Sequence, residues 1–98
     1  MPRTKKPLIP FDEKLTARKI TVLEPGEYTG ADIRSIRVTM GVSQPMFAKL
    51  VGSSPASVVH WEDGTGIPST IARRLFDVIS RDPMGYFNSF AAPRERRQ

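Results

Sequence analysis

The densest group of residues able to do chemistry lies between Ser53 and Asp63, where three serines, one histidine and two acids occur within eleven residues. A serine nucleophile needs a base held beside it, and no serine here has one at a fixed spacing. The whole chain has one histidine and no cysteine, which cannot build a standard zinc site. We therefore predict no catalytic residue, no metal site and no cofactor. The hydroxyls and the imidazole remain suited to donating and accepting hydrogen bonds.

Two short helices must position these side chains. The stretch from Ser43 to Gly64 predicts two helices of about two turns, joined at Gly52-Ser53 by a turn so short that the helices cross at about 90–120°. Such a crossing needs a small residue on the first helix, and Ala48 is there. The turn needs a residue free to take a positive φ, which Gly52 supplies. Val58, six residues on, is the branched apolar residue expected to point back at the crossing.

The rest of the chain predicts an all-α fold, a compact five-helix domain with a flexible or extended N-terminal arm. Serine or Asp-Pro signals mark most helix starts, and glycines end the first three helices. The expected starts are, in chain order, Ala31-Asp32, Ser43, Ser54, Ser69 and Asp82-Pro83. The expected core, with Trp61 as its largest member, consists of the helical stripes Ile33, Ile36, Met40, Phe47, Leu50, Val51, Val58, Trp61, Ile71, Leu75, Val78 and Ile79.

Several short motifs occur in order across this region. Ser43-Gln44 opens the second helix, Phe47-Ala48 lies within it, and the run from Trp61 to Gly64 reads Trp-Glu-Asp-Gly. Together they resemble the helix-turn-helix of the lambda-repressor/Cro-like (XRE-type) family, over roughly residues 31–80. The resemblance also implies a structural ion pair between Arg37 of the first helix and Glu62 of the third.

A narrower resemblance is to the HigA-type antitoxins. It rests on the sequence from Ile33 to Gly64, on the Ile67-Pro68-Ser69 that follows, and on the later Arg81-Asp82-Pro83. This resemblance implies a homodimer that binds a double-stranded DNA operator, represses its own operon and neutralises a cognate mRNA-cleaving toxin protein.

The resemblance further implies that the third helix enters the major groove, where all four base pairs can be distinguished. Its outward residues are Pro55, Ala56, Ser57, Val59 and His60. Ser57 and His60 lie one turn apart and share a face, so His60 can donate to guanine N7 or O6, or contact phosphate. The helix has no Arg or Lys. We therefore expect modest base-specific energy per half-site and a reliance on dimer spacing and DNA shape.

Phosphate contacts are expected from the start of the second helix, where free backbone N–H groups and Gln44 form a natural clamp. Ser54, Lys49 and Thr65 are further candidates. The N-terminal arm could reach along the backbone or into the minor groove through Arg3, Lys5 and Lys6.

The formal net charge of +5 lies in the two ends of the chain. Residues 7–93 hold nine basic and nine acidic residues, and residues 31–80 carry only +1. Basic composition is therefore no argument for a basic binding face. Arg73-Arg74 is expected to be a solvated helix surface. With no apolar run near the roughly 20 residues of a membrane span and no secretory signal, we expect a cytoplasmic protein without membrane contact.

The 98 residues allow one domain. We divide the chain into a basic arm (1–29), a DNA-binding domain (30–92, with the helix-turn-helix at 43–64) and a basic tail (93–98). Residues 19–23 are either a short strand that pairs only with a partner chain or an extended linker. Tyr86, Phe87 and Phe90 either complete the core or form a two-fold dimer patch.

Two alternatives to an autoregulating antitoxin stay open. One is a stand-alone phage- or plasmid-type regulator without a toxin, which a toxin-binding test would separate from an antitoxin. The other is a protein-interaction module that uses this fold without DNA. It would keep all its binding after alanine substitution of Gln44, Ser57 and His60. An enzyme is not expected, because no paired acid–base arrangement is present.

Overall fold

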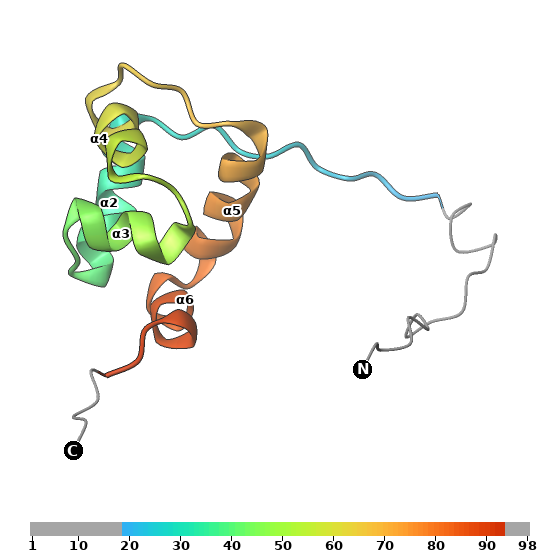
Figure 1. Ribbon diagram of the computed structural model, residues 1–98. Helices are drawn as coiled ribbons and strands as arrows, with labels where there is room; N and C mark the ends of the chain where they lie inside the picture. The colour runs from blue at the N-terminus through green and yellow to red at the C-terminus, as the bar shows by residue number, and fades with distance from the viewer. Residues whose placement is uncertain (1–18, 94–98) are drawn as a thin grey trace, which may run out of the picture.

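The structure, a computed structural model, describes residues 19–93 of the chain. Five helices follow one another without a strand in these residues, as expected from the sequence (Figure 1). They are α2 (Gly30–Met40), α3 (Gln44–Val51), α4 (Pro55–Asp63), α5 (Thr70–Arg81) and α6 (Pro83–Phe90). No helix within 19–93 is long and apolar enough to cross a membrane.

Local signals place the helix ends. Ser43, Ser54 and Ser69 each accept a backbone N–H three residues on, as their positions predict. α2 begins at Gly30, slightly before the expected start, because Thr29 and Asp32 form a reciprocal capping box. Its pattern, Thr-x-x-Asp, is visible in the sequence.

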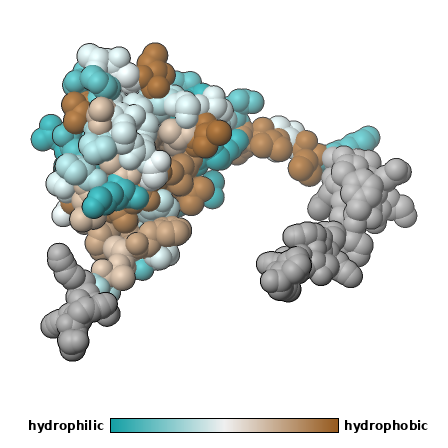
Figure 2. Space-filling model, viewed as in Figure 1, coloured by the Kyte–Doolittle hydropathy of each residue, from teal (hydrophilic) through white to brown (hydrophobic). Residues whose placement is uncertain are grey.

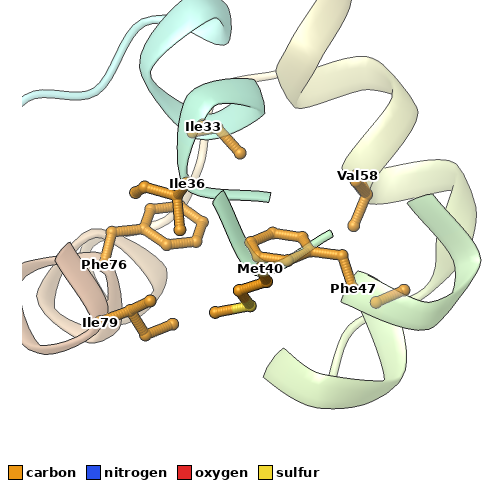
Figure 3. Close-up of a cluster of buried hydrophobic side chains, with 8 residues drawn as sticks. Ile33, Ile36, Met40, Phe47, Val58, Phe76 and Ile79 are labelled. Atoms are coloured by element: carbon orange, nitrogen blue, oxygen red, sulfur yellow. The ribbon is translucent and has the colours of Figure 1, made fainter. Parts of the chain in front are cut away.

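The core lies where α2, α3, α4 and α5 converge (Figure 3). Its fully enclosed aromatic rings are Phe47 and Phe76, whose centroids lie 6.4 Å apart. The Phe76 ring also packs at a steep angle against the rings of Trp61 and Tyr28, each at 5.5 Å between centroids. The buried set is Ile33, Ile36, Met40, Phe47, Ala48, Val58, Phe76 and Ile79.

The expected inward stripe of α5 was partly wrong. Ile71 is 83% exposed and Val78 is 54% exposed, whereas Phe76 is completely buried. Ile79 is buried and Leu75 packs against the core, as expected, and the inward side is completed by Ala72 and Phe76, at i−7 and i−3 from Ile79. Because α5 is apolar on two adjacent faces, periodicity alone admits both registers, and packing against α2 and α3 selects the one that buries an aromatic ring.

Trp61 also differs from the expectation. It is half-buried at the edge of the core, where it packs on Phe76, and it is not the largest enclosed residue. A residue at i+3 from the fully buried Val58 lies 60° away around the helix, so it reaches the margin of the buried face.

The three aromatic residues of α6, whose role the sequence left open, differ in their surroundings. Tyr86 and Phe87 pack against the core, and the Tyr86 hydroxyl donates to the Leu50 carbonyl at 2.7 Å. Phe90 is 66% exposed beside an apolar groove of about 540 Å³ between α3 and α6. The first two therefore complete the monomer, and a role of Phe90 in a dimer stays a prediction.

The segment before α2 is fastened to α5. The Asp77 carboxylate accepts the Gly26 amide at 3.0 Å and the Tyr28 hydroxyl at 2.7 Å, and Arg73 donates to the carbonyls of Pro25 and Gly26. Arg73 is thus a structural clamp, contrary to the expected solvated role. The carbonyls of an extended segment have no partner within the segment, so they accept hydrogen bonds from a nearby donor of another element. The sequence does not indicate this pairing, because the two partners are far apart along the chain.

Residues 19–23 form no strand within the single chain. Their apolar side chains Ile20, Val22 and Leu23 are 69–75% exposed, visible as brown atoms along the extended segment in Figure 2. Pairing with a partner chain stays a prediction. Arg3, Lys5 and Lys6 of the arm, and residues 94–98 of the tail, lie outside the described residues.

Candidate nucleic-acid interface

The joint between α3 and α4 has the geometry that its spacing predicts. Gly52 takes φ 76°, and the backbone N–H of Ser53 donates to the Ala48 carbonyl at 2.9 Å. Ala48 is 1% exposed and Val58 is fully buried. Because α4 is held against the core by Val58, its opposite side faces solvent.

The exposed side of α4 presents small and polar groups. Pro55, Ala56, Val59 and His60 are exposed, and Ser57 is half-buried. At the start of the helix, Ser54 Oγ accepts the Ser57 amide at 3.1 Å and lies 3.0 Å from Ser57 Oγ. The capping residue Ser54 therefore positions the Ser57 hydroxyl and also satisfies a backbone N–H at the start of α4.

The loop after α4 folds back on His60. His60 Nδ1 lies 2.9 Å from Thr65 Oγ1, which lies 2.6 Å from Asp63 Oδ1. Hydrogen bonds from the Thr65 hydroxyl and amide lower the pKa of Asp63. A Cβ on Gly66 would stand 2.8 Å from His60 Cβ, so the loop passes too close to α4 at this point for a side chain. Ser57, His60 and Thr65 share the lining of one open hollow of about 360 Å³.

An ion pair braces α4 from behind. Arg37 donates to both Glu62 carboxylate oxygens, at 2.7 and 3.0 Å, and to the Val42 carbonyl at 3.0 Å. The side chains of Arg37 and Glu62 are 15% and 6% exposed. Gln44 Nε2 donates to Glu62 at 3.0 Å, so one carboxylate joins α2, α3 and α4.

Glu62 is ionised in this setting. Burial would raise the pKa of Glu62, but the hydrogen bonds from Arg37 and Gln44 outweigh burial and hold the pKa below its usual value. The arrangement therefore depends on a charged carboxylate.

The residues expected to contact DNA fall into three groups. Ser54, Ser57, His60 and Thr65 are linked by hydrogen bonds or a shared hollow, with Pro55, Ala56 and Val59 exposed on the same helix. Gln44 is half-buried and gives one amide proton to Glu62, which leaves one for an outside acceptor. Lys49 lies elsewhere, on the groove between α3 and α6.

Asp63 is the residue of this surface that sequence reasoning missed. Its carboxylate accepts the amide and the hydroxyl of Thr65 and so shapes the loop beside His60. The available signal was Asp-x-Thr beginning at the last residue of a helix, a spacing typical of an Asx turn.

No family model matches the chain. A curated protein, the antitoxin HigA-2 of Vibrio cholerae serotype O1 (strain ATCC 39315 / El Tor Inaba N16961), is 32% identical over 72 residues, which cover 71% of this chain and 69% of that relative. The five-helix fold, the short joint between α3 and α4 and the similarity to this antitoxin together define an XRE-type helix-turn-helix protein. The chain belongs to the family of HigA-type antitoxins, a family of non-enzymatic DNA-binding proteins.

The charged state of Glu62 makes stability depend on pH. The folded-state pKa of Glu62 is lowered. Its contribution to the free energy of unfolding is therefore complete above the unfolded-state pKa of about 4.3, and it is lost as the pH falls through the folded-state pKa. We expect denaturant unfolding to show a smaller stability loss between neutral and acidic pH in Glu62→Gln than in the wild type. Glu27→Gln, at a side chain 96% exposed, should retain the wild-type loss. Equal losses in all three proteins would contradict the assignment.

Proposed function

We propose that this protein is a sequence-specific repressor that binds double-stranded operator DNA as a homodimer, with α4 as the recognition helix. We further propose that it is the antitoxin of a toxin–antitoxin pair and represses its own operon. Family membership supports the class of DNA-binding regulator, and the printed name of the Vibrio relative supports the antitoxin role.

The observation that carries the DNA-binding proposal is the outward side of α4. Its exposed positions have no bulky or acidic side chain from Pro55 to His60, while Val58 and the Glu62 network hold the helix from the core side. A helix that is rigid on one face and carries small and polar residues on the other can approach base edges closely. One short helix without Arg or Lys binds weakly, so two half-sites about one DNA turn apart are needed.

Binding to the DNA upstream of the protein's own reading frame tests the proposal. We expect Ser57→Ala and His60→Ala each to weaken specific binding about 5- to 100-fold in fluorescence anisotropy, the usual range for losing one base contact. Ser80→Ala, the same kind of change on α5, should bind like the wild type. If the wild type did not bind this DNA, and the Gln44, Ser57 and His60 triple alanine variant still bound protein partners like the wild type, a protein-interaction module would be favoured.

The basic arm is expected to contribute salt-dependent affinity. Its residues Arg3, Lys5 and Lys6 can neutralise phosphates, so deleting residues 1–7 should flatten the slope of log K against log salt by up to about 0.9 per lost contact. Replacing the same residues by a neutral segment of equal length controls for chain length. An unchanged slope would remove the arm from the DNA interface.

The toxin partner is tested separately. If a small toxin is encoded beside this protein, co-purification of the two chains and recovery of growth on co-expression support the antitoxin role. DNA binding without a toxin that this protein neutralises would instead support a stand-alone regulator.

A further inference from the structure

The hydrogen bonds around His60 determine where its proton lies. A threonine hydroxyl has one proton, and an ionised carboxylate has none to give. The 2.6 Å contact between Thr65 Oγ1 and Asp63 Oδ1 therefore uses the Thr65 proton, because only the hydroxyl can donate in it. The Thr65 amide donates to the same carboxylate oxygen at 2.9 Å, which fixes Asp63 as the acceptor of this loop.

With its proton committed to Asp63, Thr65 Oγ1 can only accept in its 2.9 Å contact with His60 Nδ1. Nδ1 must then carry the imidazole proton. A neutral imidazole has a single N–H, so Nε2 is left with a lone pair and acts as an acceptor. His60 is exposed on the side of α4 that also carries Ser57, so this acceptor is available to a ligand on that face.

The four bases differ in what they offer such an acceptor. In the major groove adenine N6 and cytosine N4 carry amino protons, whereas guanine presents N7 and O6 and thymine presents O4, all of which are acceptors. A lone pair on Nε2 therefore meets a donor on adenine or cytosine and another lone pair on guanine or thymine. This is the reverse of the donor role toward guanine that the residue type alone suggests.

We propose that His60 is a specificity-determining acceptor that selects adenine or cytosine at one position of each half-site, with Thr65 and Asp63 as the residues that orient its proton. The proposal rests on the proposed DNA-binding function and adds the class of base that His60 reads. Thr65 acts through His60, so it is a positioning residue here.

Two substitutions of Thr65 separate orientation from packing. Thr65→Val keeps the shape and the backbone amide bond to Asp63 but removes the hydroxyl, so nothing holds the proton on Nδ1. Thr65→Ser keeps the hydroxyl and is the matched control. In the full-length protein at mildly alkaline pH, long-range ¹H–¹⁵N NMR should show the proton of the neutral ring on Nδ1 in the wild type and Thr65→Ser. It should show a shift toward Nε2 protonation in Thr65→Val.

The base preference is then read from selection on randomised operator half-sites. The position read by His60 is the one whose preference disappears in His60→Ala. At that position the wild type and Thr65→Ser should favour adenine or cytosine about tenfold over guanine and thymine, and Thr65→Val should lose most of that ratio. The ratio matters, because loss of a phosphate contact from Thr65 would weaken all sequences equally.

Each outcome decides the proposal. Nε2 protonation in the wild type would overturn it, as would a guanine or thymine preference, an identical preference in Thr65→Val, or no position that depends on His60. Failure of all variants to bind any DNA would overturn the proposed function together with the base selection, while the NMR result would still judge the proton assignment on its own.

Discussion

Phe76→Ala is expected to destabilise the domain by about 3–5 kcal/mol, the usual cost of removing a buried aromatic ring from a packed core. Phe76 is completely enclosed and touches Phe47 of α3, Trp61 of α4 and Tyr28 of the segment before α2, so its removal leaves a cavity that two helices and this segment would have to fill. A single small domain has only about 5–15 kcal/mol in total. The variant should therefore unfold at a much lower denaturant concentration.

Ile71→Ala is the matched control for Phe76. It removes an apolar side chain from the same helix, but Ile71 is 83% exposed, and such changes usually stay within about 0.5 kcal/mol. The pair of variants also tests the register of α5, because the stripe expected from the sequence predicts the opposite order. A larger loss for Ile71→Ala than for Phe76→Ala would mean that α5 is rotated from its position in the structure.

Arg37→Ala is expected to cost about 3 kcal/mol, because it leaves the Glu62 carboxylate charged and largely enclosed without its main partner. Glu62 also holds Gln44 at the start of α3, so the loss reaches the joint that orients α4. Urea unfolding measures the change in stability. On the proposed function, DNA affinity measured on the folded fraction should fall as well, since α4 is the proposed recognition helix.

Arg34→Ala supplies the control on the same helix. Arg34 is exposed, so removing it should change stability by no more than about 0.5 kcal/mol. A double variant, Arg37→Met with Glu62→Leu, replaces both charges by apolar groups and should recover part of the loss. If Arg37→Ala and Arg34→Ala proved equally stable, the ion pair would not brace the domain.

The helix boundaries were largely predictable because their causes are local. Ser43, Ser54 and Ser69 cap helices, and Gly41 and Gly52 end them, through contacts within a few residues along the chain. The spacing of Ala48, Gly52 and Val58 predicted the joint for the same reason. Since one short turn constrains how its two helices cross, little tertiary information was needed.

The errors arose where two registers satisfied the same local pattern. The expected stripe of α5 was right at Leu75 and Ile79 and wrong at Ile71 and Val78, because the period of a helix does not choose between two overlapping apolar faces. The role of Arg73 was missed for a related reason. Its acceptors, the carbonyls of Pro25 and Gly26, lie 48 and 47 residues away in the chain.

By itself the sequence determined the helices, their caps and the α3–α4 joint, because each depends on neighbours within one or two turns. It also indicated the family, since its motifs keep their order and spacing. Only the tertiary structure decided which side of α5 faces the core, that Arg73 donates to distant carbonyls, and how the Asp63–Thr65 loop returns to His60. These features depend on which surfaces meet in space. Packing selects among arrangements that local propensity leaves nearly equal in free energy.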